Sequence, residues 1–384
     1  PPRSTLFPYT TLFRSWSTNE RMKKSFAFSE DDQLEKIAFH VGSEFEIAAL
    51  PDRLRRLQTR QKRLRTGEEH LPSDRIERRR AVSITELESY ARCPFRYGIE
   101  RLIDAKTPME EMTSVSPLAI GQIVHEIMKE LYEEQGLVGI PFAQVPKETL
   151  ERMSILLDEK FEQKWQEIER AHLDVPLYER LLTKRLWRKR LQKWWEAERK
   201  CFWDNEKLAD MAIMALEKPL RVVLSLRGGE QLVLTGKADR VDISDSAFVV
   251  YDYKTGNVNF HEEEIRAGLK IQLPLYAFAL QEQLKDRQAD GATYISLHDP
   301  EKRAGNGIWR EEHVGKRSKY EVKQRAKKDD TLGTEAFLTK YELNERIEQL
   351  WIGMHADFSV TPLDCSPYCP YETICRVTKE QKEA

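Results

Sequence analysis

The stretch LTGKADR at residues 234–240, followed by VYDYKTG at residues 250–256, decides the fold that this chain is expected to adopt. The first stretch lies in a region, from about 217 to 253, in which the apolar residues follow the spacing of β-strands, and the second begins at the end of this region. Turn-forming residues at 228–229 and 244–246 divide this region. Strands joined by such short turns run antiparallel, so the region predicts an antiparallel meander.

Three charged side chains of the second hairpin predict a metal-dependent site. A turn centred on residues 245 and 246 places Asp239 opposite Asp252, with their Cβ atoms about 4.5–5.5 Å apart. Strand alternation puts Lys254 on the same face as Asp252. Two facing carboxylates repel unless a cation lies between them, and Mg²⁺ prefers oxygen ligands. We therefore expect Mg²⁺ or Mn²⁺ here, with Lys254 orienting or deprotonating water; the alternative is a surface hairpin with solvated charges.

The patterns on either side of the meander are mostly helical. A capping box at Ser83 begins a helix that Pro94 ends. Further patterns predict helices at 117–134, 262–284 and 334–355, helical structure through 147–208, and a strand at 292–297. Helices around a strand meander predict an α/β domain with a central mixed sheet.

The composition is that of a globular protein. The chain has 384 residues, 33% of them charged, and a net charge of −2, so any DNA contact must come from local clusters. No apolar run reaches the ~18 residues of a membrane span and no secretory signal begins the sequence, which predicts a cytoplasmic protein. Residues 1–15 look like an adaptor-derived, non-native segment, and residues 16–80 predict a basic helical linker.

Four of the five cysteines predict a thiolate site. Cys365, Cys369 and Cys375 lie close together near the end of the sequence, and Cys93 can supply a fourth ligand from far upstream. Such soft ligands suit either Zn²⁺ or an iron–sulfur cluster, and the chemistry of the residues leaves both open. Cys201 is expected to be a small buried residue.

Several motifs resemble those of one nuclease family. GKADR at 236–240 and DYKTG at 252–256 resemble the second and third motifs of the RecB-like branch of the PD-(D/E)xK nucleases. GQIVHE at 121–126 resembles the helical first motif, which contains a metal-binding histidine. IQLPLY at 271–276 resembles the Gln–Tyr motif of a helix near the active site.

This resemblance implies a fold and a set of site residues. The fold is a restriction-endonuclease-like α/β core at residues 81–384, with a mixed sheet flanked by helices. Asp239, Asp252 and His125 would hold the metal ion with the carbonyl of Tyr253, and Lys254 would be the catalytic lysine. Gln272 and Tyr276 would complete the catalytic site from their helix.

The resemblance also implies a cofactor and partners. One early and three late cysteines are similar to the 4Fe–4S staple of AddB-type nuclease domains, although Cys365 and Cys369 are one residue further apart than is usual. Such a domain would act on DNA as an exonuclease in double-strand break repair and recombination, with an AddA-like protein as its partner. Residues 16–80 would end an upstream helicase-like region. The alternative is a catalytically inactive, cluster-stabilised protein that binds DNA or serves as a scaffold.

A basic segment that contains tryptophans allows two interpretations. Residues 184–195 combine several Lys and Arg side chains with Trp187, Trp194 and Trp195. In one interpretation, the tryptophans stack on the bases of single-stranded DNA. In the other, the tryptophans and Leu186 dock the helix on the sheet while the cations stay solvated. The sequence favours neither interpretation.

Overall fold

The computed structural model describes residues 81–102, 114–227, 229–300, 306–311, 327–365, 369–371 and 375. The segments 1–15 and 16–80, for which an adaptor and a basic linker were predicted, lie outside the described residues.

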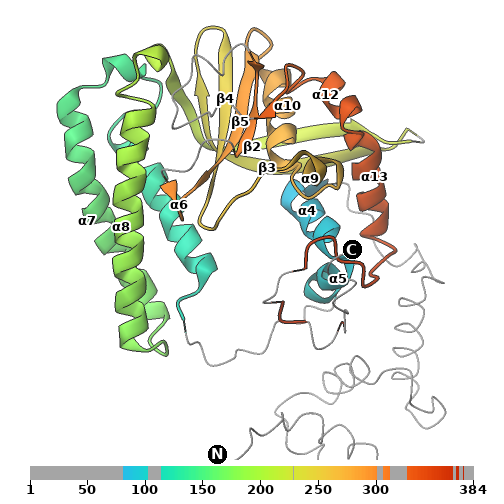
Figure 1. Ribbon diagram of the computed structural model, residues 1–384, viewed down its shortest axis with the longest axis horizontal. Helices are drawn as coiled ribbons and strands as arrows, with labels where there is room; N and C mark the ends of the chain where they lie inside the picture. The colour runs from blue at the N-terminus through green and yellow to red at the C-terminus, as the bar shows by residue number, and fades with distance from the viewer. Residues whose placement is uncertain are drawn as a thin grey trace, which may run out of the picture.

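The strands of the described residues form one seven-stranded sheet (Figure 1). They are β1 (Ala81–Ser83), β2 (Ala212–Ser225), β3 (Gln231–Ile243), β4 (Ala247–Lys254), β5 (Gln288–Ser296), β6 (Gly307–Trp309) and β7 (Lys327–Lys328). The order is β1-β3-β4-β5-β6-β7, and β2 pairs with β3. Because β1–β3, β4–β5 and β6–β7 are parallel and the other pairs antiparallel, the predicted mixed sheet is confirmed.

Helices cover both faces of this sheet (Figure 1). They are α4 (Ile84–Arg92), α5 (Pro94–Leu102), α6 (Pro117–Glu134), α7 (Lys147–Ala171), α8 (Leu177–Cys201), α9 (Glu262–Arg266), α10 (Gln272–Gln283), α12 (Glu335–Lys340) and α13 (Leu343–Gly353), with 3-10 turns η3 (Phe142–Gln144) and η4 (Glu206–Leu208). One buried apolar cluster packs α6, α7 and α8 on the sheet, and another packs α4, α10, α12 and α13 on it. None of the helices within the described ranges has the length and apolar character that a membrane crossing requires.

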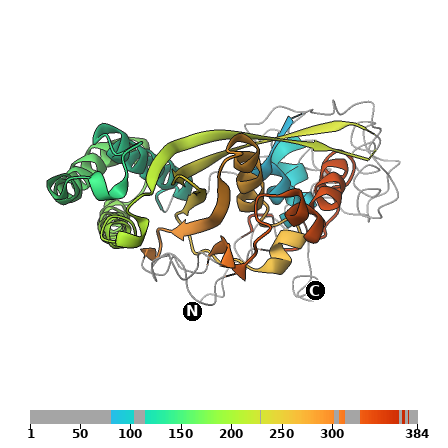
Figure 2. The ribbon, with the colours of Figure 1, turned by 90° about the horizontal axis from the view of Figure 1, so that it is seen from above.

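The long hairpin of β2 and β3 runs across the molecule, and β4 folds back beside the later part of β3 (Figure 2). The β3–β4 register pairs Arg240 with Tyr251 and Ile243 with Phe248, in the antiparallel alignment predicted from the turn at 244–246. Continued by one pair, this register sets Asp239 opposite Asp252. Alternation along the strands then directs Arg240 and Tyr251 away from this pair, toward Tyr132 of α6 and the C-terminal end of α8.

Three of the predicted helical regions are interrupted. Pro176 precedes α8 and separates it from α7, because the proline ring disfavours a helical conformation at the residue before it. Gly268, with φ +79°, separates α9 from α10, and Glu342, with φ +54°, separates α12 from α13. A left-handed residue ends the regular helix, so the single helices predicted at 262–284 and 334–355 were wrong in extent.

A buried arginine joins the sheet to the helices α6 and α8. The Arg240 guanidinium donates to both carboxylate oxygens of Asp242 at 2.7 Å and to Glu198 Oε2 on α8 at 2.8 Å. All three side chains are fully buried. The guanidinium also lies 4.2 Å from the centre of the Phe202 ring, and the Tyr132 hydroxyl on α6 donates to Glu198. This charged cluster fixes how the helical layer sits on β3.

Candidate functional site

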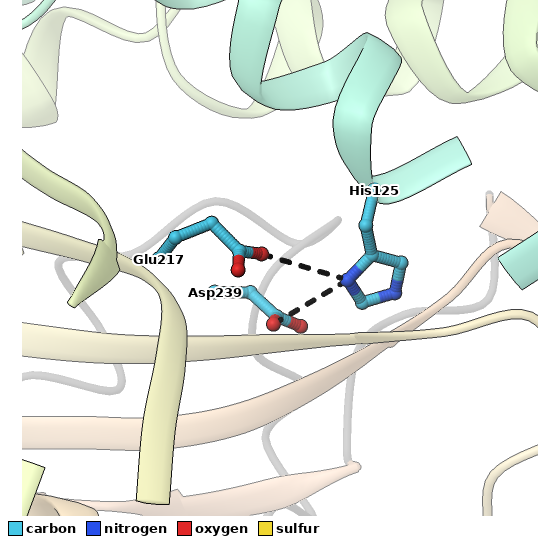
Figure 3. A group of neighbouring side chains, drawn as sticks. All are labelled: His125, Glu217 and Asp239. Atoms are coloured by element: carbon cyan, nitrogen blue, oxygen red, sulfur yellow. Dashed lines mark ion pairs between the residues drawn. The ribbon is translucent and has the colours of Figure 1, made fainter. Parts of the chain in front are cut away.

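Three side chains from three elements converge where β3 passes under α6. The His125 imidazole on α6 points toward the carboxylates of Glu217 on β2 and Asp239 on β3 (Figure 3). His125 Nδ1 lies 3.4 Å from Asp239 Oδ1 and 3.9 Å from Glu217 Oε1. One nitrogen and two carboxylate oxygens, all within 4.8 Å of one another, form a donor set suited to a divalent cation.

Glu217 is the site residue that the sequence reasoning missed. The β2–β3 register pairs Leu216 with Arg240 and Lys218 with Ala238, which sets Glu217 opposite Asp239. Its φ of +51° is left-handed, an uncommon conformation for a residue other than glycine. The turn residues at 228–229 do not reveal it, because a two-residue turn there would pair Lys218, and not Glu217, with Asp239. A slip of one residue turns the wrong face of β2 toward the site.

The protonation of these groups reflects their mutual attraction. Burial lowers the pKa of His125, but its interactions with Asp239 and Glu217 outweigh this effect and raise the pKa to about 10. The interaction with His125 in turn lowers the pKa of Glu217 to about 2, although burial opposes this shift. A proton on His125 thus supplies positive charge to both carboxylates, and the Lys237 ammonium adds an ion pair with Glu217. A bound cation would replace the proton on His125.

Asp252 lies deeper, next to Lys254 and Gln272. Its Oδ2 is 2.5 Å from Lys254 Nζ, and its Oδ1 accepts a hydrogen bond of 2.9 Å from Gln272 Nε2. Burial raises the pKa of Asp252 to about 6, against the lowering effect of Lys254 and with a further contribution from Asp239. Burial lowers the pKa of Lys254, but Asp252 and Asp239 raise it more, so the amine stays charged.

Gln272 connects the acidic group to a tyrosine. Its Oε1 accepts a hydrogen bond of 3.1 Å from Lys254 Nζ, and its Nε2 donates to the Tyr276 hydroxyl at 3.0 Å. This hydroxyl accepts a further bond of 3.0 Å from the backbone N–H of Lys237. A Cβ at Gly236 would lie 2.3 Å from the Tyr276 ring, so only glycine lets the ring lie against β3.

One open pocket of about 420 Å³ contains most of the predicted site. Its lining side chains are Ser83, Thr85, His125, Thr235, Lys237, Asp239, Asp252, Lys254, Gln272 and Tyr276. Tyr253 takes another position: its N–H donates to Asp239 Oδ2 at 2.6 Å, and its ring lies against Trp194 on the opposite face. The metal contact predicted for the Tyr253 carbonyl stays a prediction.

The four cysteines of the predicted thiolate site line a second, smaller cavity. Cys93, Cys365, Cys369 and Cys375 surround it together with Arg92, Phe95, Arg96 and Tyr371. Burial raises the pKa of the Cys93 thiol, and the nearby Cys369 and Cys375 raise it further. Cys201 is fully buried away from them, as expected. Helix α4 connects the two cavities, because its N-cap Ser83 lines the first and its C-cap Cys93 lines the second.

The tryptophans of α8 pack into the core. Trp187, Trp194 and Trp195 are buried, so they are not available to stack on bases. Lys184 and Arg188 form ion pairs with acidic residues of α7. These tryptophans therefore dock the helix and do not stack on bases. The docking interpretation was wrong for Leu186, which is 46% exposed, and for Lys184 and Arg188, whose charges are paired with α7.

Comparisons with known proteins agree with this geometry. A sequence model of the PD-(D/E)XK nuclease superfamily matches residues 81–376. The chain is similar to the B subunit of the ATP-dependent helicase/deoxyribonuclease of Thermoanaerobacter sp. (strain X514), with 25% identity over 365 residues that cover 78% of this chain and 31% of that protein. The corresponding protein of Clostridium novyi (strain NT) is 27% identical over 229 residues, covering 57% of this chain and 20% of that protein.

A third relative gives the same result. The corresponding protein of Caldanaerobacter subterraneus subsp. tengcongensis is 23% identical over 352 residues, which cover 77% of this chain and 29% of that protein. The chain therefore spans less than a third of the length of these relatives. Because the superfamily match extends over most of the chain and includes both strands of the acidic hairpin, this chain belongs to the PD-(D/E)XK nuclease superfamily.

Proposed function

We propose that this chain is a Mg²⁺- or Mn²⁺-dependent DNA nuclease that hydrolyses phosphodiester bonds. The observation that carries the proposal is the pocket in which Asp239, Asp252 and Lys254 meet beside His125. Asp239, Asp252, His125 and Glu217 would hold the ion, assisted by the Tyr253 carbonyl. Carboxylates flanked by a histidine and a lysine fit a hard cation that also contacts a phosphate.

The residues of the pocket would divide the chemistry among them. The bound cation would supply Lewis-acid polarisation of the phosphate and a more acidic water. The Lys254 ammonium would position the attacking water and stabilise the negative charge that develops on the phosphate oxygens. The Gln272 amide would hold Lys254 Nζ at the edge of Asp252, and the Tyr276 hydroxyl would fix the other side of that amide.

Removal of divalent cations is expected to abolish DNA cleavage, because the carboxylates would then repel the phosphate. End-labelled single- and double-stranded DNA should be stable with EDTA and degraded when Mg²⁺ is added in excess. Release of labelled mononucleotides would identify an exonuclease. Cleavage that continues in EDTA would contradict the metal site. DNA binding without cleavage, in either Mg²⁺ or Mn²⁺, would favour the inactive scaffold.

The proposed setting is a larger helicase–nuclease. Relatives named as the B subunit of an ATP-dependent helicase/deoxyribonuclease support an AddB-type nuclease domain, working with an AddA-like partner in double-strand break repair and recombination. An exonuclease that receives one strand from the motor would need the open pocket to accept a single extended strand.

A 4Fe–4S cluster is the proposed ligand of the four cysteines. Cys93 and the three late cysteines line one cavity although they are far apart in the sequence. Four thiolates around one cavity suit either a cluster or a zinc ion. The resemblance to AddB-type nuclease domains favours the cluster.

Cys93→Ser is expected to lose the cluster and to unfold at a lower denaturant concentration. The cluster would join two distant parts of the chain and so restrict the unfolded state. Iron, sulfide and zinc contents and visible absorption should be measured after anaerobic purification. Cys201→Ser is the matched control, because this cysteine lies outside the cavity, and it should keep its iron. Stoichiometric zinc in a colourless wild-type protein would refute the cluster.

A further inference from the structure

A carboxylate on α4 lies at the first turn of α10, beside the pocket. Glu88 Oε1 accepts hydrogen bonds from the backbone N–H groups of Ile271 and Gln272, both at 2.8 Å. The first N–H groups of a helix have no partner within that helix. No side chain at the N-cap of α10, Ile271, satisfies them. Glu88 therefore caps α10 from a distant part of the sequence.

Gln272 links this helix cap to the nuclease site, because its backbone N–H contacts Glu88 and its side chain contacts site residues. It is the first residue of α10, and its side chain accepts from Lys254 Nζ and donates to Asp252 Oδ1. A side chain on the first turn follows any movement of the backbone of that turn. Because Glu88 holds the backbone N–H of Gln272 itself, it also restricts where the side-chain amide can lie.

An acid at this position has an energetic cost. Glu88 is half-buried, and this burial raises the pKa of its carboxyl group to about 7, while the two N–H groups, Lys254 and Lys270 counteract the shift only in part. Apolar residues would fill the same space without that cost. The carboxyl group thus contributes something that packing alone does not, namely two acceptor bonds aimed at one helix end.

We propose that Glu88 is a positioning residue of the nuclease site, which fixes the first turn of α10 so that the Gln272 amide bridges Lys254 and Asp252. The inference rests on the proposed function. It gives α4 a role in catalysis through Glu88, which lies in the middle of the helix, about one turn after the pocket-lining residues Ser83 and Thr85.

Glu88→Ala is expected to lower kcat for DNA cleavage roughly 10–100-fold and to change KM less than about threefold, as is typical when the partner of a site residue is removed. Glu88→Gln keeps an acceptor oxygen and should restore most of the activity. Ser89→Ala is the matched control, because Ser89 is exposed on the same helix and bonds only within it. Equal losses in the Ala and Gln variants would refute positioning through these two bonds.

A double-mutant cycle separates positioning from a general loss of stability. If Glu88 acts through Gln272, the double variant Glu88→Ala/Gln272→Ala should turn over within about twofold of Gln272→Ala alone. A double variant whose loss of kcat equals the product of the losses in the two single variants would overturn the proposal. Amide hydrogen exchange gives an independent measurement. The N–H groups of Ile271 and Gln272 should exchange faster in Glu88→Ala than in the wild type, and their exchange rates should be unchanged in Ser89→Ala.

The two failures are distinguishable. A wild-type chain that cleaves no DNA in Mg²⁺ or Mn²⁺ refutes the proposed function, whereas the exchange of the Ile271 and Gln272 amides still reports whether Glu88 caps the helix. An active wild-type chain whose Glu88→Ala variant is equally active refutes the positioning role alone. Unchanged amide exchange in that variant refutes the capping contact itself.

Discussion

Asp252→Asn is expected to reduce Mg²⁺-dependent DNA cleavage by about 10³-fold or more, because it removes a carboxylate from the centre of the metal site. Its free energy of unfolding, measured without metal at pH 8, should change little, because the removal of a buried charge is offset by the loss of a contact with Lys254 or Gln272. Burial raises the pKa of Asp252 from 3.8 to about 6, so the folded protein holds a proton more tightly than the unfolded chain. Stability is thus lost as the pH rises through this interval, and the uncharged asparagine avoids that loss.

The measurements are initial cleavage rates on end-labelled DNA and urea unfolding of the same preparations. Asp245→Asn is the matched control, since it makes the same change at the exposed turn of the same hairpin and should leave both quantities unaltered. DNA affinity should be retained in both variants. Undiminished cleavage by Asp252→Asn would refute the assignment of catalysis to this site, and a large loss of stability would mean that the lost activity reflects unfolding.

Local signals in the sequence were sufficient for the acidic hairpin. The short turn centred on residues 245 and 246 determines the register that sets Asp239 opposite Asp252. Glu217 escaped detection because the loop between β2 and β3 is longer than its two glycines suggest, and the register of a strand cannot tolerate an error of one residue. The pairing of two strands can be predicted from sequence only where the length of the turn between them can be predicted.

Contacts between distant segments were beyond the sequence alone. The resemblance to nuclease motifs placed Gln272 and Tyr276 near the site, but not the two bonds that Glu88 makes to the start of α10. Because side chains alternate along a strand, the sequence predicts that Asp239 and Arg240 point in opposite directions. It does not indicate that Glu198 of α8 is the partner of Arg240. Such pairs depend on how whole helices pack, which local patterns do not encode.

Arg240→Met is expected to lower the free energy of unfolding by about 3–5 kcal/mol, because it leaves two carboxylates buried without their cation. Asp242 and Glu198 are both fully buried beside the guanidinium, so water cannot replace it. Urea unfolding at neutral pH measures the change. Arg221→Met is the matched control on the neighbouring strand, where the side chain is exposed, and it should shift stability by no more than about 0.5 kcal/mol.

A second variant tests whether the charged cluster stabilises the fold or mainly specifies how it packs. Replacing all three groups, as Arg240→Met with Asp242→Leu and Glu198→Leu, removes every buried charge and should recover most of the stability lost by Arg240→Met. The cleavage rate of this variant then reports whether β3 has kept its position, because Asp239 is the neighbour of Arg240 on that strand. A stable but inactive triple variant would mean that the ion cluster sets the strand against α6 and so brings Asp239 to His125. A triple variant as unstable as Arg240→Met would instead make the cluster a net source of stability.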